Sequence, residues 1–394
     1  MQYTFSKRIR ALQPSAVSDI LKATASPDVI PFAAGNPDVA AFPVAEVQEI
    51  SARILKENPL LALQYNVTEG YAPLREGVFS YLQSSQGIGK DFDRLLITNG
   101  AQQTMDLATK ALCDYGDVVI AESPSFVGAL NCFRSYGVTL RGVPMQPDGM
   151  DLDVLEEILK TEQRVRFIYT IPNFQNPTGY TMSLEKRQRL YALAKQYGVL
   201  ILEDNPYGDL RAEGTAIPSI KSMDTDGLVL YAGSFSKILS PGLRVAYAIA
   251  PKAIFEKLAT GKQCTDVHTP IFNQMLVHEW MQTTDFEAHI EKIRKIYRRK
   301  LNLMCDGIEQ NLSAFVDFIR PAGGMFVWCT LPETIDMVTF CNAALKKGVA
   351  VVPGTAFLVE PTETTNSFRM NFTTPSDADI VKGLEILGNL HYAL

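Results

Sequence analysis

The order of apolar and polar positions along the chain predicts an α/β protein. Short apolar runs recur from Leu95 to Ala250, and segments with helical spacing of apolar side chains separate most of them. The runs that read as strands are Leu95–Thr98, Val118–Ala121, Val138–Val143, Val165–Thr170, Val199–Glu203, Leu228–Ala232 and Val245–Ala250. Strands that alternate with helices predict a large domain with a mainly parallel seven-stranded sheet covered by helices.

The last two predicted strands are joined differently from the others. Only a loop lies between Leu228–Ala232 and Val245–Ala250, and no helical pattern separates them. A parallel return normally needs a crossover of about a dozen residues or more. We therefore expect one of these two strands to run antiparallel to its neighbours.

The pattern changes on both sides of this region. The first 40 residues look like an arm, with a short helical pattern around Ile20 and then a turn rich in Gly, Pro and Asn. After Pro251 a long helical region covers about 269–311, and short strands mixed with helices follow it. We predict an N-terminal arm (1–40) that packs with the small domain, a large domain (41–255) and a smaller α+β C-terminal domain (256–394).

Composition and charge exclude several classes of partner. The 394 residues are 46% apolar and 20% charged, as in an ordinary globular protein. A net charge of −6 argues against binding nucleic acid by phosphate neutralisation, and the basic cluster Lys292–Lys300 fits a solvated helix face. No run reaches about 18 apolar residues, so no membrane partner is expected.

Cysteine and histidine spacing adds two further expectations. The six cysteines form no C-x-x-C pair and no disulfide-like spacing, which is typical of a reduced, cytoplasmic protein. The four histidines lie too far apart for a local ligand motif, so no metal site is predicted.

The loop between the last two predicted strands is rich in chemistry. Its groups include the hydroxyls of Ser234 and Ser236, the amine of Lys237, the turn Pro241-Gly242 and the guanidinium of Arg244. Arginine and serine suit a phosphate, and a lysine in such a pocket can become an amine nucleophile. A plain strand-to-strand loop with a solvated lysine and a surface arginine would look the same.

Other predicted strands also end at groups suited to a ligand. In open α/β sheets, ligands lie at the carboxyl ends of the strands. The groups found there are the glycine turn Asn99-Gly100-Ala101-Gln102, the aromatic ring of Phe126, the amide of Asn176, the carboxylate of Asp204 and the phenol of Tyr207. Each of these groups alone has a structural explanation. Pyridoxal 5′-phosphate would use them together, because it carries a phosphate, a flat ring, a ring nitrogen, a phenolic oxygen and an aldehyde, each of which needs such a partner.

Over essentially its whole length, the chain resembles the fold-type I pyridoxal-phosphate enzymes, specifically the class I/II aminotransferases. The resemblance rests on Asn176-Pro177-Thr178-Gly179, Glu203-Asp204-Asn205-Pro206-Tyr207, Ser234-Phe235-Ser236-Lys237, Pro241-Gly242-Leu243-Arg244 and Phe368-Arg369-Met370-Asn371-Phe372. The longer run that starts at Pro172 is most similar to the 2-aminoadipate, kynurenine and aromatic aminotransferase branch.

The resemblance implies a role for each of these residues. Lys237 is expected to form the internal Schiff base and to move the Cα proton, while Asp204 keeps the pyridine nitrogen protonated. The implied catalytic residues are Lys237, Asp204 and Tyr207. The implied cofactor-binding residues are Gly100, Ala101, Gln102, Phe126, Asn176, Asp204, Tyr207, Ser234, Ser236, Lys237 and Arg244, joined by Tyr65, which would reach the phosphate of the partner subunit in a homodimer.

The substrates follow from the same resemblance. Arg369 would bind the α-carboxylate, with Asn176 and the Gly35 backbone nearby, and an α-amino acid would give its amino group to a 2-oxo acid such as 2-oxoglutarate. Two positions depart from the family pattern. Ser18 stands where relatives often have an arginine that contacts the substrate side chain, and Phe126 stands where tyrosine is common. Ser18 argues against recognition of an acidic side chain by the usual route, and Phe126 offers no hydroxyl at its position. We expect an aromatic, aliphatic or 2-aminoadipate-like donor, with preference for aromatic and aliphatic side chains.

Other functions remain open at this point. The same cofactor on the same fold supports β-lyases and decarboxylases, although an arginine that fixes the carboxylate opposes decarboxylation. Some transcriptional regulators carry this domain behind a DNA-binding module, but the arm is too short for that module. A dehydrogenase is disfavoured because no G-x-G-x-x-G follows a predicted strand.

Overall fold

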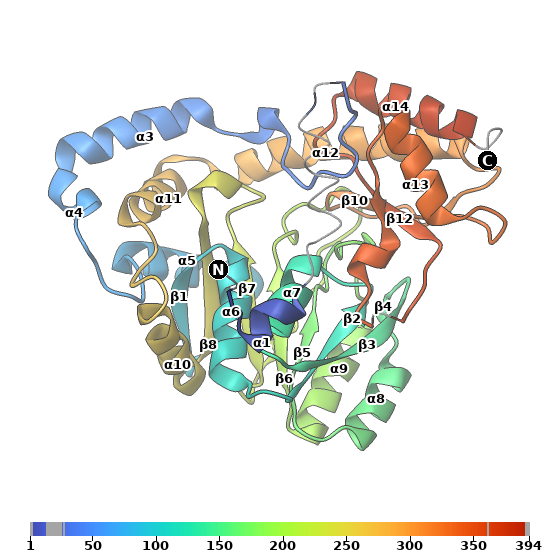
Figure 1. Ribbon diagram of the computed structural model, residues 1–394. Coiled ribbons are helices and arrows are strands. Elements are labelled where there is room, and N and C mark those ends of the chain that lie inside the picture. The colour runs from blue at the N-terminus through green and yellow to red at the C-terminus, as the bar shows by residue number, and fades with distance from the viewer. Residues whose placement is uncertain (1–2, 13–25, 27, 361, 391–394) are drawn as a thin grey trace.

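Two sheets with covering helices make up the molecule (Figure 1). The computed structural model describes residues 3–12, 26, 28–360 and 362–390. The predicted helical pattern around Ile20 and the Ser18 position lie outside these residues. Within them, no helix is both long and apolar enough to cross a bilayer.

The large sheet has the strand order β1-β8-β7-β6-β5-β2-β3-β4. Its strands are β1 (Asp93–Asn99), β2 (Val118–Ser123), β3 (Thr139–Gln146), β4 (Gly149–Met150), β5 (Val165–Thr170), β6 (Leu200–Asn205), β7 (Val229–Ser234) and β8 (Val245–Pro251). The mainly parallel sheet is confirmed, and the short β4 adds an eighth strand to the predicted seven. As predicted for the last pair, β8 runs antiparallel, both to β7 and to β1.

Helices pack on both faces of this sheet because its strands are apolar on both. Ile120 and Ile168 belong to the core beneath α8 and α9, whereas Val119 and Phe167 belong to the core that contains α6 and α7. The helices around the sheet are α5 (Ala72–Gln86), α6 (Ala101–Leu112), α7 (Val127–Ser135), α8 (Leu152–Thr161), α9 (Leu184–Tyr197), α10 (Lys252–Gln263) and α11 (Ile271–Thr283). Two further helices, α3 (Val44–Glu57) and α4 (Pro59–Leu63), pack against α11. The short α1 (Lys7–Ala11) contacts α7.

The helical region expected over about 269–311 consists of two helices, α11 and α12 (Phe286–Asn311). They are separate because Asp285 accepts a hydrogen bond from the Ala288 N–H and caps the start of α12. In addition, α10 follows β8 directly and is not predicted by the pattern.

The small sheet is antiparallel, with the order β11-β12-β10-β9. Its strands are β9 (Asp317–Phe318), β10 (Phe326–Thr330), β11 (Val352–Pro353) and β12 (Ser367–Asn371), and α12, α13 (Met337–Lys346) and α14 (Asp377–Leu390) surround it. One continuous apolar core includes Leu96 of the large sheet, Ile293 of α12 and Phe368 of the small sheet. The domain boundary near residue 255 stays a prediction.

The last part of the predicted arm is joined to the small sheet. Ile30 forms a bridge with Val349, and the Phe32 carbonyl accepts a hydrogen bond of 2.7 Å from the Asn371 N–H. The hydroxyl of Thr373 donates to the Asn36 carbonyl at 2.8 Å. These bonds hold Ala33, Ala34 and Gly35 beside β12, where they form part of the candidate site.

Candidate active site

A cavity of about 620 Å³ opens where the carboxyl ends of β5, β6 and β7 face the small sheet. All of the residues predicted from the sequence line it except Gly100 and Tyr65. The predicted residues in its wall are Gly35, Ala101, Gln102, Phe126, Asn176, Asp204, Tyr207, Ser234, Ser236, Lys237, Arg244 and Arg369. Its size lies within the range of small-molecule sites in proteins, roughly 300–1,000 Å³.

Lys237 stands in the loop between β7 and β8 with its amine directed into the cavity. Its Nζ donates a hydrogen bond of 2.8 Å to the Gly35 carbonyl. Burial, with the charges of Arg369 and Arg244, lowers the pKa of Lys237 to about 8. An ordinary lysine has a pKa of about 10.4, so this amine is neutral, and therefore nucleophilic, at a much lower pH.

Asp204 lies at the end of β6, almost completely buried. Its Oδ2 accepts a hydrogen bond of 2.8 Å from the Tyr169 hydroxyl, while its Oδ1 is buried and has no hydrogen-bond partner in the described part of the chain. Burial, together with the charge of Glu122, raises the pKa of Asp204 to about 7. A cationic N–H on a ligand would satisfy Oδ1, and the protonated pyridine nitrogen of pyridoxal phosphate is such a donor.

The amino terminus of α6 fits a phosphate. No side chain of the described residues caps this helix, so the first-turn N–H groups of Ala101 and Gln102 point outward at the positive end of the helix dipole. Gly100 precedes it with a φ of 74°, and a Cβ there would lie 2.0 Å from Nη2 of Arg244. Glycine therefore lets the arginine approach the helix end, which explains why Gly100 supports the site without lining it.

Two serines stand opposite this helix end. Ser234 donates to the Ser236 hydroxyl at 2.9 Å, and the Ser234 oxygen accepts from the Ser236 N–H at 3.1 Å. Arg244 donates to the Asn99 carbonyl at 3.2 Å. Two hydroxyls, a guanidinium and free backbone N–H groups are the donors that an anionic phosphate requires.

Arg369 of β12 reaches the cavity from the small sheet. Its Nη1 donates to the Asn176 Oδ1 at 2.8 Å and its Nη2 to the Ala33 carbonyl at 2.9 Å, while its Nε is buried without a partner in the described residues. The guanidinium lies 4.2 Å from the ring centre of Phe326 and 5.0 Å from that of Phe357. Burial lowers its pKa to about 10, so it remains a cation at neutral pH and suits a carboxylate.

Aromatic and apolar side chains complete the wall. Phe126 precedes α7, and a Cβ on Gly128 would lie 2.5 Å from its ring, so glycine makes room for that ring. The Tyr207 ring meets Phe326 edge to face at 5.9 Å. Phe326, Phe357 and Tyr169 were not predicted from the sequence. The two phenylalanines have no local signal that distinguishes them from core aromatic residues, whereas the hydroxyl of Tyr169 in a buried strand was a usable signal.

A second buried carboxylate lies beneath the site. Glu122 accepts hydrogen bonds from the Thr170 hydroxyl at 2.5 Å and from Gln175 Nε2 at 3.1 Å. The Gln175 Oε1 in turn accepts from the N–H and the hydroxyl of Thr178. This network fixes the turn that carries Asn176, and burial raises the pKa of Glu122 to about 7.

Tyr65 lies outside the cavity. It is 79% exposed, and its ring meets His268 edge to face at 5.9 Å. The described residues also contain no group of three or more His, Cys, Asp or Glu side chains arranged to hold a metal ion.

Comparison with known proteins places this geometry in a family. Residues 27–387 match the family model described as aminotransferase class I and II. The chain is 40% identical to the 2-aminoadipate transaminase of Thermus thermophilus, covering 98% of this chain and 95% of that protein. It is 37% identical to aromatic-amino-acid aminotransferase 1 of Thermococcus litoralis, covering 97% of this chain and 93% of that one.

A solved structure agrees with these relatives. The kynurenine aminotransferase of Pyrococcus horikoshii, crystallised in complex with pyridoxamine phosphate, superposes with a TM-score of 0.95 at 36% identity, over 99% of this chain and 97% of that one. The site residues fit the same cofactor, since Asp204 offers an unpaired buried oxygen and α6 an uncapped amino terminus. The chain belongs to the class I and II aminotransferase family, and it is a pyridoxal-phosphate-dependent transaminase.

Proposed function

We propose that this enzyme moves the amino group of an α-amino acid with an aromatic, aliphatic or 2-aminoadipate-like side chain to a 2-oxo acid, with 2-oxoglutarate as the acceptor. One observation carries the proposal. A single cavity brings together the amine of Lys237, the unpaired carboxylate oxygen of Asp204 and the guanidinium of Arg369. These groups supply a proton carrier, a partner for a ring nitrogen and a carboxylate-binding group.

The residues divide the work at the cofactor between them. When bound, the cofactor supplies a ring that delocalises negative charge from the substrate Cα. Asp204 would hold a proton on the ring nitrogen, and Asn176 and Tyr207 would donate hydrogen bonds to the phenolic oxygen. Ala101, Gln102, Ser234, Ser236 and Arg244 would hold the phosphate, Phe126 would pack on the ring face, and Lys237 would carry the proton at Cα.

The charges of the wall favour donors with uncharged side chains. The charged groups that line the cavity are Asp204, Lys237, Arg244 and Arg369, and each already has a role with the cofactor or the α-carboxylate. Among the described lining residues no further cation remains for a second carboxylate. Met105, Val127 and Ile171 instead give apolar surface. We therefore place aromatic and aliphatic donors ahead of acidic ones.

A panel of donors tests this function. With 2-oxoglutarate as acceptor, we expect L-phenylalanine and L-leucine to be converted with a kcat/KM at least about tenfold above that of L-aspartate. The short side chain of aspartate would hold its second carboxylate unpaired inside the cavity, whereas the longer chain of 2-oxoglutarate would place its distal carboxylate nearer the opening. Phenethylamine, which lacks the carboxylate that Arg369 would bind, should not be converted. Glutamate formation, followed by chromatography, is the measurement.

The same assay distinguishes a transaminase from a β-lyase, the alternative function. A β-lyase would release ammonia and pyruvate from cysteine conjugates without needing a 2-oxo acid acceptor. Ammonia release in the absence of 2-oxoglutarate, with no glutamate formed in its presence, would overturn the proposal.

We further propose a homodimer whose sites lie at the interface. Large apolar side chains are exposed on and around α3 and α4, the helices at the far left of Figure 1; they include Val39 (80%), Leu60 (86%) and Leu63 (77%), and Tyr65 follows them. Exposed apolar groups gathered in one region are typical of a protein interface. A partner covering them would bring Tyr65 toward its phosphate site.

Sedimentation of matched variants tests the dimer. We expect the unaltered protein to sediment as a dimer, and Leu60→Asp with Leu63→Asp to shift it to monomer and weaken cofactor binding. Val381→Asp, at an exposed valine on α14, should leave the dimer intact. An unaltered protein that is monomeric at micromolar concentration would contradict the proposal.

All six cysteines are unpaired, which supports a reducing, cytoplasmic location that cell fractionation would check.

A further inference from the structure

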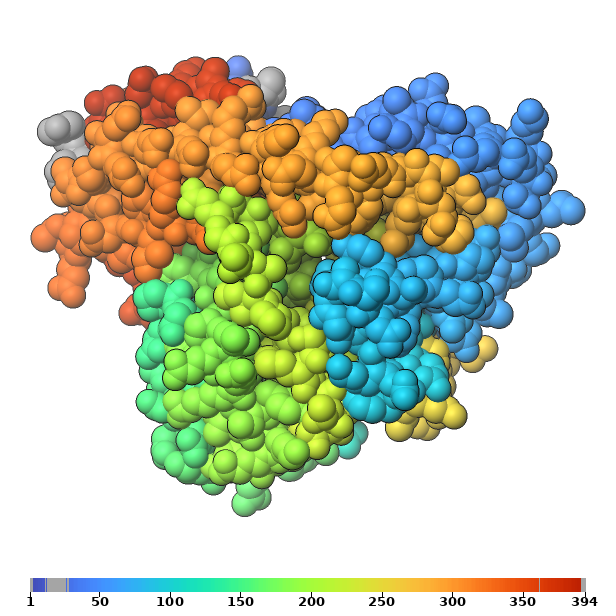
Figure 2. Space-filling view, turned by 180° about the vertical axis from the view of Figure 1, so that it is seen from behind, coloured from blue at the N-terminus to red at the C-terminus, as the bar shows by residue number. Residues whose placement is uncertain are grey.

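A second cavity lies on the other face of the large sheet. It has a volume of about 380 Å³ and is lined from α5, the ends of β6 and β7, the segment after β6, and the start of α12. From behind, Figure 2 shows a hollow where blue, yellow-green and orange parts of the chain meet. Its size also falls within the range of small-molecule sites.

Strand geometry places the two cavities back to back. Successive side chains of β6 point to opposite faces, so Asp204 lines the catalytic cavity and Asn205 the second one. Tyr231 of β7 also faces the second cavity, and Ser234 at the end of β7 lines both. The second cavity is therefore distinct from the catalytic one and shares a wall with it.

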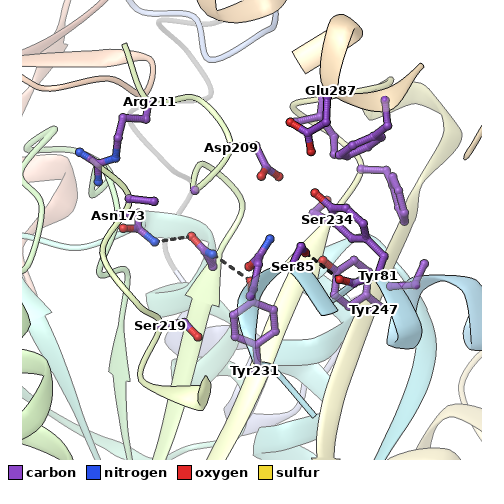
Figure 3. Close-up of a pocket in the computed structure, with 18 of the residues that line it drawn as sticks. Tyr81, Ser85, Asn173, Asp209, Arg211, Ser219, Tyr231, Ser234, Tyr247 and Glu287 are labelled. Atoms are coloured by element: carbon purple, nitrogen blue, oxygen red, sulfur yellow. Dashed lines mark hydrogen bonds between the residues drawn. The ribbon is translucent and has the colours of Figure 1, made fainter. Parts of the chain in front are cut away.

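Part of the polar lining is already satisfied by internal bonds. Asn173 Nδ2 donates to the Asn205 Oδ1 at 2.8 Å, and Asn205 Nδ2 donates to the Tyr231 hydroxyl at 2.8 Å, as drawn in Figure 3. The Asn173 Oδ1 accepts from Arg187 at 2.7 Å. These amides shape the cavity but have little capacity left for a ligand.

Other polar groups of the lining are unpaired. The carboxylate of Asp209 accepts no hydrogen bond and makes no ion pair with any described residue, and in Figure 3 it points into the space between the labelled side chains. Burial raises the pKa of Asp209; Arg294 opposes the shift and Glu287 adds to it. The Tyr247 hydroxyl likewise has no hydrogen-bond partner in the described chain, and its ring lies so close over Gly233 that a Cβ there would be 2.4 Å from the hydroxyl oxygen.

Positively charged arginines line the same cavity as these acidic groups. Arg294 donates from Nε to the Asp209 carbonyl at 2.9 Å, and its other N–H groups have no partner among the described residues, which leaves them for a ligand. In Figure 3, Arg211 lies on the far side of Asp209 from Glu287, and its guanidinium is 4.8 Å from the ring centre of Phe174. The acidic lining residues Asp209 and Glu287 are matched by Arg211 and Arg294. Apolar groups complete the wall: Val78, Phe235, Ile238, Met281 and Phe286.

We propose that this second cavity binds a free α-amino acid with an apolar side chain. Asp209 and Glu287 receive its ammonium group, Arg294 receives its carboxylate, and the side chain packs on the apolar wall. A lining that carries both signs of charge with no excess matches a zwitterion, whereas a simple amine or a simple carboxylic acid would leave one charged group unpaired. The site does not depend on which amino acids the enzyme transaminates.

Calorimetry on the holoenzyme tests the site. Borohydride treatment first fixes the cofactor, so that an added amine cannot react with it. The probes are L-leucine, isoamylamine, which lacks the carboxylate, and 4-methylpentanoate, which lacks the ammonium group. We expect saturable binding of L-leucine, with the other two at least about tenfold weaker, as expected when a charged hydrogen-bond partner is lost.

Variants locate the bound leucine. Asp209→Asn and Tyr247→Phe should each weaken leucine binding, the former by about tenfold or more, while transamination by the untreated enzymes persists. Asp91→Asn, which removes an exposed carboxylate elsewhere, is the matched control and should bind as the unaltered protein does. Absence of saturable binding, equal binding of 4-methylpentanoate, or leucine binding that Asp209→Asn leaves unchanged would overturn the proposal.

Discussion

Lys237→Ala is expected to lower kcat by roughly 10⁴-fold, the upper end of what a positioned proton-transfer group contributes. The variant removes the amine that lies in the catalytic cavity and donates to the Gly35 carbonyl. Alanine leaves no other amine among the described residues of the cavity wall, whose other basic side chains are the guanidinium groups of Arg244 and Arg369. Single-turnover kinetics with L-phenylalanine, followed by the absorbance of the bound cofactor, measure the loss.

Mass spectrometry separates this role from a general loss of structure. After borohydride treatment, the unaltered protein should carry the cofactor mass on the peptide that contains Lys237, and the variant should carry none. Added methylamine should restore part of the variant's rate because a small amine can occupy the vacated space. A variant with nearly full activity, or cofactor fixed to another lysine, would show that Lys237 is not the proton carrier.

Asp204→Asn is expected to lower the kcat of the cofactor-loaded enzyme and to raise the stability of the cofactor-free protein. In the loaded enzyme the amide cannot hold a proton on the ring nitrogen, and kcat should fall by about 10²–10³-fold, as for other groups directed at developing charge. Tyr169→Phe, which removes only the hydroxyl that donates to Asp204, should cost much less. A loaded Asp204→Asn enzyme within a few-fold of normal kcat would contradict the assigned role.

The cofactor-free variant should instead be more stable than the cofactor-free parent. Burial raises the pKa of Asp204 to about 7 in the folded chain, above its unfolded value of about 3.9. The buried charge therefore destabilises the parent progressively as pH rises above about 4, and fully above about 7. Asparagine does not ionise, so the difference in urea midpoint should be larger at pH 8 than at pH 5. An equal difference in urea midpoint at pH 5 and pH 8 would refute this prediction.

The strand ends were the most informative part of the sequence. Asp204 and Lys237 each follow a predicted buried strand, and the carboxyl ends of parallel strands meet at one sheet edge, so their convergence follows from chain order. Gly100 was found for the same reason, although its function is to admit Arg244 rather than to face the cavity.

Residues that depend on packing between distant segments were not predictable in this way. Phe326 and Phe357 enter the cavity only because the small sheet lies over the large one. The division of α11 from α12 depends on one cap, Asp285, within an otherwise continuous helical pattern. The second cavity forms where α5 and α12 approach β7, and no periodicity in any one of them signals it.

The loop that carries Lys237 is held by the protein itself. Strand pairing joins Ser234 to Ala246 at its base, and the Leu239 N–H donates to the Phe235 carbonyl at 2.8 Å within it. Its shape is thus set by the same pairing that builds the sheet, before any ligand arrives. A cell that runs short of vitamin B6 would then accumulate folded, loadable protein instead of unfolded chain, and activity could return as fast as the vitamin is resupplied, without new synthesis.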